Sequence, residues 1–598
     1  MAAADMAAFD PAAYDGVDLA DGTGPFHAQR GYVHATWART FGSRPELFVQ
    51  PATVAEVEQV VRLARHRRRR VTTTGCGHSP SDMTCTSSWL VNLDRLNRVL
   101  SIEAPDETLT SSGSSAFRPL VTVQAGIRLR DLSAALAGHG LALPNLGSIN
   151  AQSLAGALAT GTHGSSLQHG LLSDDVAALR ITLGDGRTVA LTRPAGGDLF
   201  RAALISLGAL GIVVEITLRV VPAFRLRWSQ TVDSDEAVFA AWRSVAGKSK
   251  SEPQSSESSD SSESSDSSES SESTDPTTIN TSSSRNSLLW TQAHFVRVWW
   301  FPYTRRAVVW AADDANIASS EPDHVPAVSY YDSRLGYLVY HNLLYLARFI
   351  PRILPWVEWF VFGMQYGFRA GTTTSGLQPG DHALLMNCLY SQYVNEWAIP
   401  LARGPEALAR LGAWLNRLQP GDPAYVDHRI PFSADGLYVH APVEVRVTDT
   451  APGSFAARHQ PDDQLDCRPL LDPTVRDGPT LYLNAIMYRP YFADPPGTDR
   501  YYEAFEWLMR DLGGRPHWAK NFGAKHADIA AAYGSDLQRF LAVRQQADPD
   551  GLFVGPWHRR YLLGSDVPPL PLEEHERSRA ADVDSGVCIT GELAPAES

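Results

Sequence analysis

The sequence predicts an α+β fold in two domains, and three observations lead to this prediction. Segments with period-two alternation are interspersed with segments of helical periodicity along most of the chain. The chain has 598 residues, of which 44% are hydrophobic and 20% charged, which is enough apolar material for two cores. A serine-rich acidic run then interrupts the second block of predicted elements.

The domain boundaries follow these changes in composition. We expect an irregular leader at 1–43, a first domain at 44–223, a second domain at 224–563 and a polar tail at 564–598. Residues 251–284 contain eight acidic residues and no lysine or arginine. Such a segment cannot bury enough apolar surface to offset its ordering entropy, so we expect a disordered insertion there.

The first domain is expected to begin with a strand, a helix and a second strand. Residues 48–50 predict a short strand, and Thr53 and Glu56 form a capping box at the start of an amphipathic helix. Residues 71–74 are rich in β-branched side chains and predict a strand that runs directly into a glycine-rich turn at 75–80.

The remainder of the first domain continues to alternate between strands and helices. The predicted elements are a strand at 121–125, a helix at 129–136, a small-residue segment at 147–164, a hairpin of 176–183 and 187–192, a helix at 198–207 and a strand at 212–221.

The second domain is expected to combine aromatic-rich strands with helices. Strands are predicted at 294–301 and 481–488, and helices at 406–418 and 501–512. Val443 to Val447 alternates strictly, which places Glu444 and Arg446 on one face of a strand, roughly 6.5 Å apart. On pattern alone, this pair is typical of a solvent-facing ion pair on a surface strand.

Residues 336–368 form an apolar segment with two possible interpretations. Three charged residues and two prolines divide it into pieces shorter than the ~18 residues that a membrane span needs. It is either a buried helical pair in the core or an interfacial element with Trp356, Trp359 and Tyr366 at the depth of lipid headgroups.

Composition and missing motifs exclude several classes of protein. A net charge of −14 argues against a dedicated nucleic-acid binder. Five scattered cysteines indicate a reducing compartment, and the start of the chain has no arginine before Arg30, so we expect no cleavable N-terminal signal. The sequence contains no P-loop, no H-E-x-x-H and no G-x-S-x-G, and no metal site is expected.

Two glycine-rich segments are the candidate binding site. Gly75 and Gly77 let backbone N–H groups approach an anion closely, and the hydroxyls of Thr74 and Ser79 add donors, which predicts a pyrophosphate cradle. An ordinary glycine-rich turn is the alternative. The small residues of 147–164 permit a bulky planar ligand to lie against the backbone, although tight helix packing gives the same pattern.

Two sets of motifs together resemble those of a known family. The first set consists of Thr74-Gly-Cys-Gly-His78-Ser-Pro-Ser-Asp82, Val123-Gln-Ala-Gly-Ile127, Asn145-Leu-Gly-Ser-Ile149, Gly161-Thr-His-Gly164 and Leu210-Gly-Ile-Val213. This set resembles the FAD domain of the vanillyl-alcohol-oxidase flavoproteins. The second set consists of the segment from His294 to Thr304, Gln392-Tyr-Val-Asn-Glu-Trp397, Val443-Glu-Val-Arg446 and His517-Trp-Ala-Lys520. Within that family, this set resembles the fungal sugar-1,4-lactone oxidases. The resemblance covers residues 30 to 560 and implies an FAD domain joined to a substrate (cap) domain built on an antiparallel sheet with helices.

The resemblance also implies roles for individual residues. FAD would be attached covalently through His78. The remaining cofactor-binding residues would be Thr74, Gly75, Cys76, Gly77, Ser79, Gly147, Ser148, Gly156, Thr160, Gly161, Thr162, His163, Gly164, Gly211, Ile212 and Val213. Glu444 would bond the substrate hydroxyls, Arg446 would orient the substrate, and Lys520 would lie near the N1 edge of the flavin.

The reaction implied is oxidation of a sugar-1,4-lactone at C2 by hydride transfer to flavin N5, with oxygen reduced to hydrogen peroxide, in ascorbate-type biosynthesis. Glycine at position 147 implies direct use of oxygen, because an alanine methyl would occupy the space beside the flavin; a turn with positive φ is the alternative reason for glycine. The resemblance further implies a mitochondrial membrane location with contact through 336–368.

Other readings remain open at this point. One is a related flavin dehydrogenase or alditol oxidase, and another is a membrane-associated scaffold that retains flavin only for stability. The sequence leaves open the choice among D-arabinono-, L-galactono- and L-gulono-1,4-lactone, and it leaves open the oligomeric state.

Overall fold

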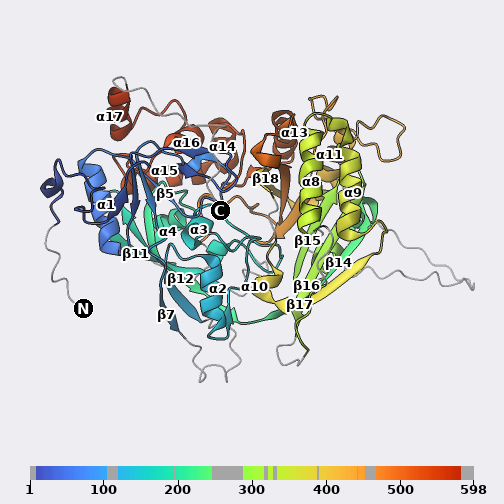
Figure 1. The fold of residues 1–598 in the computed structure, drawn as a ribbon, viewed down its shortest axis with the longest axis horizontal. Helices are drawn as coiled ribbons and strands as arrows, with labels where there is room; N and C mark the ends of the chain where they lie inside the picture. The colour runs from blue at the N-terminus through green and yellow to red at the C-terminus, as the bar shows by residue number, and fades with distance from the viewer. Residues whose placement is uncertain are drawn as a thin grey trace, which may run out of the picture.

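The computed structural model shows two α+β domains side by side (Figure 1). It describes residues 9–103, 119–193, 196–244, 287–315, 321–326, 331, 333–386, 390–440, 442–450 and 467–580. The insertion expected at 251–284 and the last part of the expected polar tail lie outside the described residues.

The first domain contains two sheets that meet near the glycine-rich turn. Strands β4 (Leu47–Gln50), β6 (Trp89–Asn92) and β5 (Val71–Thr74) run parallel to one another, and β1 (His27–Gln29) is antiparallel to β4. Helix α1 (Val54–His66) follows β4, and its predicted cap is confirmed, since the hydroxyl of Thr53 accepts a hydrogen bond from the backbone N–H of Glu56.

The second sheet of this domain is fully antiparallel. Its order is β11 (Thr188–Thr192), β10 (Val176–Leu183), β12 (Gly211–Arg219), β8 (Leu120–Gln124) and β7 (Val99–Glu103). Helices α2 (Leu129–Ala137), α3 (Leu154–Ala159) and α4 (Gly197–Leu204) belong to the same domain. The predicted hairpin at 176–192 is therefore confirmed.

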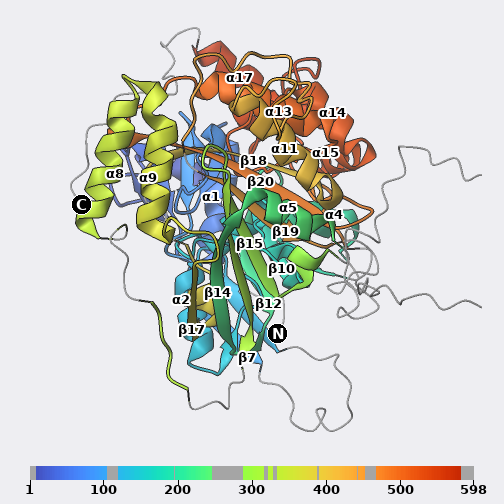
Figure 2. The ribbon, with the colours of Figure 1, turned by 90° about the vertical axis from the view of Figure 1, so that its right-hand side faces the viewer.

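The second domain is built on one large antiparallel sheet, seen almost face-on in Figure 2. Its order is β17 (Thr373–Pro379), β14 (Arg225–Ser234), β16 (Arg306–Ala315), β15 (Phe295–Phe301), β19 (Val443–Thr448), β20 (Thr480–Tyr488), β18 (Gln392–Pro400) and β21 (Arg515–Pro516). The expected antiparallel cap sheet is confirmed.

Helices cover this sheet from both sides, and two adjacent residues of β15 show it. Trp300 lies under Gly412 of α11 (Gly404–Leu415), whereas Phe301 packs edge-on against Phe362 of α9 (Leu354–Tyr366). Helices α5 (Asp235–Arg243) and α13 (Thr498–Asp511) contact α11. The face that bears Trp300 and the valines of β19 is thus sealed by α11.

The expected irregular leader at 1–43 is corrected by the structure. Strand β1 extends the parallel sheet, with Ala28 opposite Val49, and the side chains of Leu19 and Phe26 are buried in the core. Trp37 stacks on His78 with ring centroids 5.3 Å apart. Residues 17–43 therefore belong to the first domain, and short strands with few apolar residues hid this in the sequence.

The expected boundary of the second domain at residue 563 is also corrected. Helices α14 (His526–Tyr533), α15 (Ser535–Ala547) and α16 (Pro556–His558) lie beside the first domain, as the orange and red segments of Figure 1 show. The backbone N–H of Val71 donates to the carbonyl oxygen of Leu552 at 2.8 Å, and α15 contacts α4. The chain thus returns to the first domain, and the following α17 (Pro571–Ala580) adds a helix to the expected tail.

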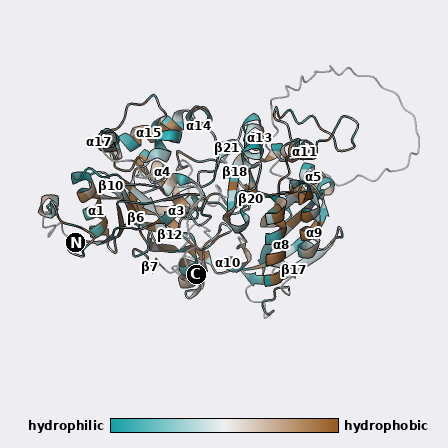
Figure 3. Cartoon of the chain, turned by 45° about the horizontal axis from the view of Figure 1, so that its top comes forward, coloured by the Kyte–Doolittle hydropathy of each residue, from teal (hydrophilic) through white to brown (hydrophobic). Residues whose placement is uncertain are grey.

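The apolar segment 336–368 forms a helical pair, α8 (Arg334–Ala347) and α9. Apolar residues, brown in Figure 3, run along both helices. One side is buried, through Tyr340, Leu344, Val357 and Val361. The other side is exposed at Leu338, Leu346, Phe349, Trp356, Trp359 and Phe368. Tyr366 differs from expectation, because it is half-buried against Phe301.

Among the helices that the structure describes, none combines the length and apolar character required to cross a membrane.

Candidate active site

The register of the large sheet places four side chains in one row. Trp299 on β15 pairs with Glu444 on β19, Glu444 pairs with Asn484 on β20, and Asn484 pairs with Glu396 on β18. Because side chains alternate along a strand, Arg446 lies on the same face as Glu444, in the next row opposite Tyr482. This face is turned toward the first domain.

Two cavities meet at His78 and Ser79. The glycine-lined cavity, of about 1050 Å³, lies in the first domain and is bounded by residues 72–79, 152–160 and 206–213. The charged cavity, of about 950 Å³, lies between the domains and is lined by residues 147–149, Glu444, Arg446, Asn484, His517 and Lys520. A ligand can therefore extend from one cavity into the other past His78.

The glycine-lined cavity fits a dinucleotide cofactor. A Cβ on Gly211 would lie 2.3 Å from the Thr182 carbonyl, so close backbone packing requires glycine there, and one on Gly75 would lie 2.0 Å from the side-chain hydroxyl of Ser153. Gly77 has a φ of +69°, which favours glycine. Of the expected cofactor-binding residues, Thr74, Gly75, Cys76, Gly77, His78, Ser79, Gly156, Thr160, Gly211, Ile212 and Val213 line this cavity.

The imidazole ring of His78 is held in its neutral form. Burial lowers its pKa to about 4, and the positive charges of Arg128 and Lys520 act in the same direction. Its Nδ1 is buried and has no hydrogen-bond partner among the described residues. The ring therefore offers a nitrogen lone pair at the junction of the two cavities.

The remaining expected cofactor residues divide into two groups. Gly147, Ser148, Thr162 and His163 line the charged cavity. Gly161 and Gly164 line neither cavity, so the expectation that they bind the cofactor directly is not supported: Gly161 faces Ile205 and Pro473, and a Cβ on Gly164 would lie 1.9 Å from Oδ1 of Asn145.

Position 147 does not require glycine for a backbone with positive φ. It is absent from the described residues with positive φ, which overturns the turn interpretation. A Cβ on Gly147 would lie 3.0 Å from Cγ2 of Thr162 and 3.5 Å from the carbonyl oxygen of His163, two residues that also line the charged cavity. A side chain at this position would therefore reduce the space of that cavity.

Glu444 and Arg446 are buried, with exposures of 4% and 6%, so the surface-strand interpretation is wrong. Nδ2 of Asn484 donates to Oε2 of Glu444 at 3.1 Å, and Nε of Arg446 lies 3.5 Å from Oε1 of Glu444. Oε1 of Glu444 accepts no hydrogen bond from the described residues. Oε1 of Glu444 is thus ion-paired with Arg446 but can still accept a hydrogen bond at the charged cavity.

Glu396 is a site residue that the sequence reasoning missed. It is fully buried, and its Oε1 accepts a hydrogen bond from Nη2 of Arg446 at 2.7 Å, while its Oε2 lies 3.2 Å from Nζ of Lys520. Burial would raise the pKa of Glu396, but Arg446 and Lys520 outweigh burial and hold this pKa well below its usual range. One carboxylate therefore fixes both predicted catalytic cations.

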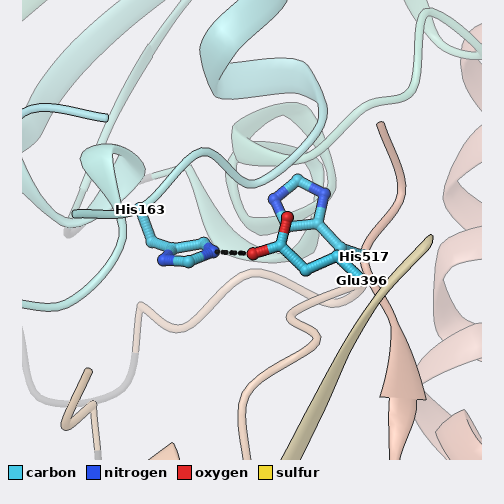
Figure 4. A group of neighbouring side chains, drawn as sticks. All are labelled: His163, Glu396 and His517. Atoms are coloured by element: carbon cyan, nitrogen blue, oxygen red, sulfur yellow. Dashed lines mark ion pairs between the residues drawn. The ribbon is translucent and has the colours of Figure 1, made fainter. Parts of the chain in front are cut away.

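Two histidines complete this cluster, and Figure 4 shows them on either side of the Glu396 carboxylate. Nε2 of His163 lies 3.2 Å from Oε1 of Glu396. Nδ1 of His517 accepts a hydrogen bond from the backbone N–H of Ala519 at 3.2 Å. All three residues lie in motifs on which the family resemblance rests. Of the three, only His163 was expected to be a site residue.

The three side chains of Figure 4 are near enough to one another to ligate a metal ion. The surrounding charges argue against this function, because Arg446 and Lys520 already pair with both oxygens of Glu396. Two cations beside the carboxylate would repel a third. The cluster is better suited to an anionic ligand.

Comparisons with known proteins agree with this geometry. Residues 45–192 match the family model of the FAD binding domain, and residues 265–561 match the model described as D-arabinono-1,4-lactone oxidase. A Neurospora crassa protein that carries this name provisionally is 55% identical over 551 residues, covering 91% of this chain and 88% of its own. The Yarrowia lipolytica D-arabinono-1,4-lactone oxidase is 35% identical over 577 residues, covering 88% and 96%.

Solved structures support the fold alone. A solvent-stable cholesterol oxidase superposes with a TM-score of 0.63 at 18% identity, covering 88% of this chain and 96% of its own.

Proposed function

The chain belongs to the D-arabinono-1,4-lactone oxidase family, and from this premise we propose that it oxidises D-arabinono-1,4-lactone or a close sugar lactone at C2, in ascorbate-type biosynthesis. The chain is an FAD-dependent oxidoreductase of the aldonolactone oxidase type. One observation carries the finer proposal: Glu444, Arg446 and Lys520 converge on one cavity that joins the glycine-lined cavity at His78.

FAD, when bound, would supply the redox chemistry: it would accept the hydride of the lactone C2 as the C2 hydroxyl loses its proton, and oxygen would then take up two electrons and two protons to give hydrogen peroxide. The protein's own groups bind and orient the lactone. Oε1 of Glu444, which is ion-paired with Arg446 but accepts no hydrogen bond from the described residues, would accept one from a lactone hydroxyl, and Asn484 holds the other oxygen of that carboxylate in place. Arg446 and Lys520 present positive charge to the same cavity, where negative charge develops during the reaction.

His78 is the proposed point of covalent attachment. Its neutral ring and its unpartnered Nδ1 support this role, because an imidazole must have a free lone pair to form a bond to carbon. Trp37 stacks on the ring and fixes its plane.

The decisive experiment is an anaerobic titration of the purified holoenzyme. We expect D-arabinono-1,4-lactone to bleach the flavin absorbance, and readmitted oxygen to restore it with one hydrogen peroxide formed per lactone oxidised. L-galactono- and L-gulono-1,4-lactone, tested in parallel, rank the substrates. Bleaching by alditols but not lactones would instead identify an alditol oxidase, and bleaching without reoxidation by oxygen would identify a dehydrogenase. A flavin that no substrate bleaches would leave only the scaffold.

A mitochondrial membrane location with peripheral contact is the second part of the proposal. The exposed side chains of α8, α9 and their connection support the membrane contact, whereas the mitochondrion rests on the family resemblance alone. Trp356 and Trp359 are 52% and 50% exposed, and Phe349 is 68% exposed. Large apolar side chains grouped on one surface are typical of interfacial binding. We expect the protein to sediment with mitochondrial membranes in high salt and to be released by mild detergent. A Trp356→Ser, Trp359→Ser variant that still sediments in the same way would refute this role.

A further inference from the structure

Arg297 is a buried guanidinium that has no part in the chemistry described so far. It lies on β15 two residues before Trp299, which lines the charged cavity, so strand alternation places both side chains on the face turned toward the first domain. The exposure of Arg297 is 2%. Its Nη2 donates to the carbonyl oxygen of Leu384 at 2.6 Å, whereas its buried Nε has no hydrogen-bond partner among the described residues.

No carboxylate in the described part of the chain forms an ion pair with this guanidinium. Its other contact is the ring of Trp310, whose centroid lies 5.3 Å from Cζ. Burial lowers the pKa of Arg297 to about 10, so the group remains charged at neutral pH. Charged side chains are almost never fully buried unless they are paired, so a lone buried cation indicates a role beyond folding.

The sheet brings this charge to the predicted catalytic pair. Val298 is opposite Val445 in the pairing of β15 with β19, and the same register continued by one residue brings Arg297 level with Arg446. Besides burial, the charge of Glu444 raises the pKa of Arg297, and the charge of Arg446 lowers it. The three ionised groups are therefore close enough to act on one another.

The charges of this group do not cancel. Apart from Arg297 they are two cations and two carboxylates, which pair with one another: Arg446, Lys520, Glu396 and Glu444. His163 and His517 add no charge, because burial lowers the pKa of both rings. Arg297 thus adds one positive unit that no described carboxylate offsets.

We propose that Arg297 is a positioning residue, which supplies the excess positive charge of the charged cavity and thereby favours negative charge on the molecules bound there. Arg297 lines neither the glycine-lined nor the charged cavity, so it acts through its charge and not by contact. The negative charge in question is that which develops on the lactone and the flavin during the reaction. The inference deepens the proposed function and rests on the flavin reaching the charged cavity.

The test is the affinity of the purified holoenzyme for sulfite, read from the flavin absorbance. The sulfur lone pair of sulfite forms a bond to flavin N5, and the adduct carries the added negative charge on the ring system. We expect Arg297→Gln to weaken this affinity about 10-fold or more, because one buried positive charge is lost. Where the wild-type affinity is too weak to measure, the flavin midpoint potential reports the same charge. Sulfite binding needs no lactone turnover, so it can fail independently of the lactone titration.

Arg193→Gln is the matched control for loss of a buried arginine. Arg193 is 3% exposed, lines neither cavity and likewise donates to backbone carbonyl oxygens, those of Ser173, Asp174 and Val176. We expect the sulfite affinity of this variant to stay within about threefold of wild type. Equal losses in Arg193→Gln and Arg297→Gln would show a general effect of packing and overturn the inference.

Arg297→Lys separates charge from shape. Burial lowers the pKa of a lysine as it does that of Arg297, so this variant should lose its charge as pH rises whereas the wild type keeps it. The sulfite affinity of Arg297→Lys relative to wild type should therefore fall between about pH 6 and pH 9. A ratio that is independent of pH, or wild-type affinity in Arg297→Gln, would leave Arg297 as a structural cation. The pH profile of Arg297→Lys decides the question if Arg297→Gln does not fold.

Discussion

Replacing Arg446 by alanine is the sharpest test of the proposed catalytic site. The guanidinium contacts two carboxylates, with Nη2 at 2.7 Å from Glu396 and Nε at 3.5 Å from Glu444. Burial would lower the pKa of Arg446, but these carboxylates outweigh burial and raise it. The alanine variant removes a fully ionised group from the charged cavity and leaves two buried carboxylates with fewer partners.

The expected effect has a catalytic and a structural part. Loss of one preorganised donor to developing negative charge costs ~10² to 10³ in rate, so flavin reduction by lactone should slow by more than ~10². Removal of one partner of a buried ion pair costs ~3 to 5 kcal/mol of unfolding free energy. We expect the lower end of this range, because Lys520 still pairs with Glu396.

Anaerobic stopped-flow measurement of flavin reduction separates these two parts, after flavin content and thermal unfolding have been measured. Arg446→Lys is the matched control: it keeps the charge but cannot contact both carboxylates with one planar group, so we expect a reduction rate between those of wild type and the alanine variant. A near-normal reduction rate in Arg446→Ala with flavin bound would refute a role for Arg446 in the reaction and leave it as a structural ion pair.

Three further predictions concern other parts of the molecule. His78→Ala should lose the flavin that otherwise stays with the protein through acid precipitation, and acid-stable flavin in this variant would show that another residue holds it. Gly147→Ala adds a methyl at 3.0 Å from the Thr162 side chain in the charged cavity, so reoxidation by oxygen should slow about 10-fold or more while reduction by lactone and transfer to dyes persist; unchanged reoxidation would remove the steric argument. Burial raises the pKa of Glu358 from 4.5 to about 7, although the backbone N–H groups of Tyr303 and Thr304 donate to it. Since the folded state binds this proton more tightly than the unfolded state, stability falls as pH rises between these two values, by on the order of 3 kcal/mol, and Glu358→Gln should flatten this dependence in unfolding experiments between about pH 5 and pH 8.

The elements that the sequence predicted well are those determined by near neighbours. The cap at Thr53, the strand that leads into Gly75 and the alternation from Val443 to Val447 depend on residues a few positions apart. The return of residues 526–558 to the first domain depends on contacts such as Val71 with Leu552, which lie far apart in the chain. No local pattern contains that information.

Glu396 shows the same limit at the active site. Its strand, β18, shows no polar–apolar alternation, and nothing in the local pattern distinguishes Glu396 from the neighbouring polar residues Gln392 and Asn395. It lies beside Arg446 only because β18, β20 and β19 pair in one particular register. Register between distant strands is a tertiary property, so the residue that pairs with both Arg446 and Lys520 could not be identified from the local pattern of the sequence.

The burial of Glu444 and Arg446 has a further cause that lies outside their own domain. Alternation gave the correct face of β19, yet the same alternation occurs on strands exposed to water. The first domain covers this face with the ring of His163, which is stacked on Tyr482, the residue opposite Arg446. The same segment is joined to the end of β19 through Ser166, whose backbone N–H donates to the carbonyl of Val447 at 2.9 Å. His163 lies three residues before Ser166, lines the charged cavity and reaches Glu396. The charged cavity therefore exists only where the two domains are joined, because one domain supplies Glu444 and Arg446 and the other supplies His78 and residues 147–149.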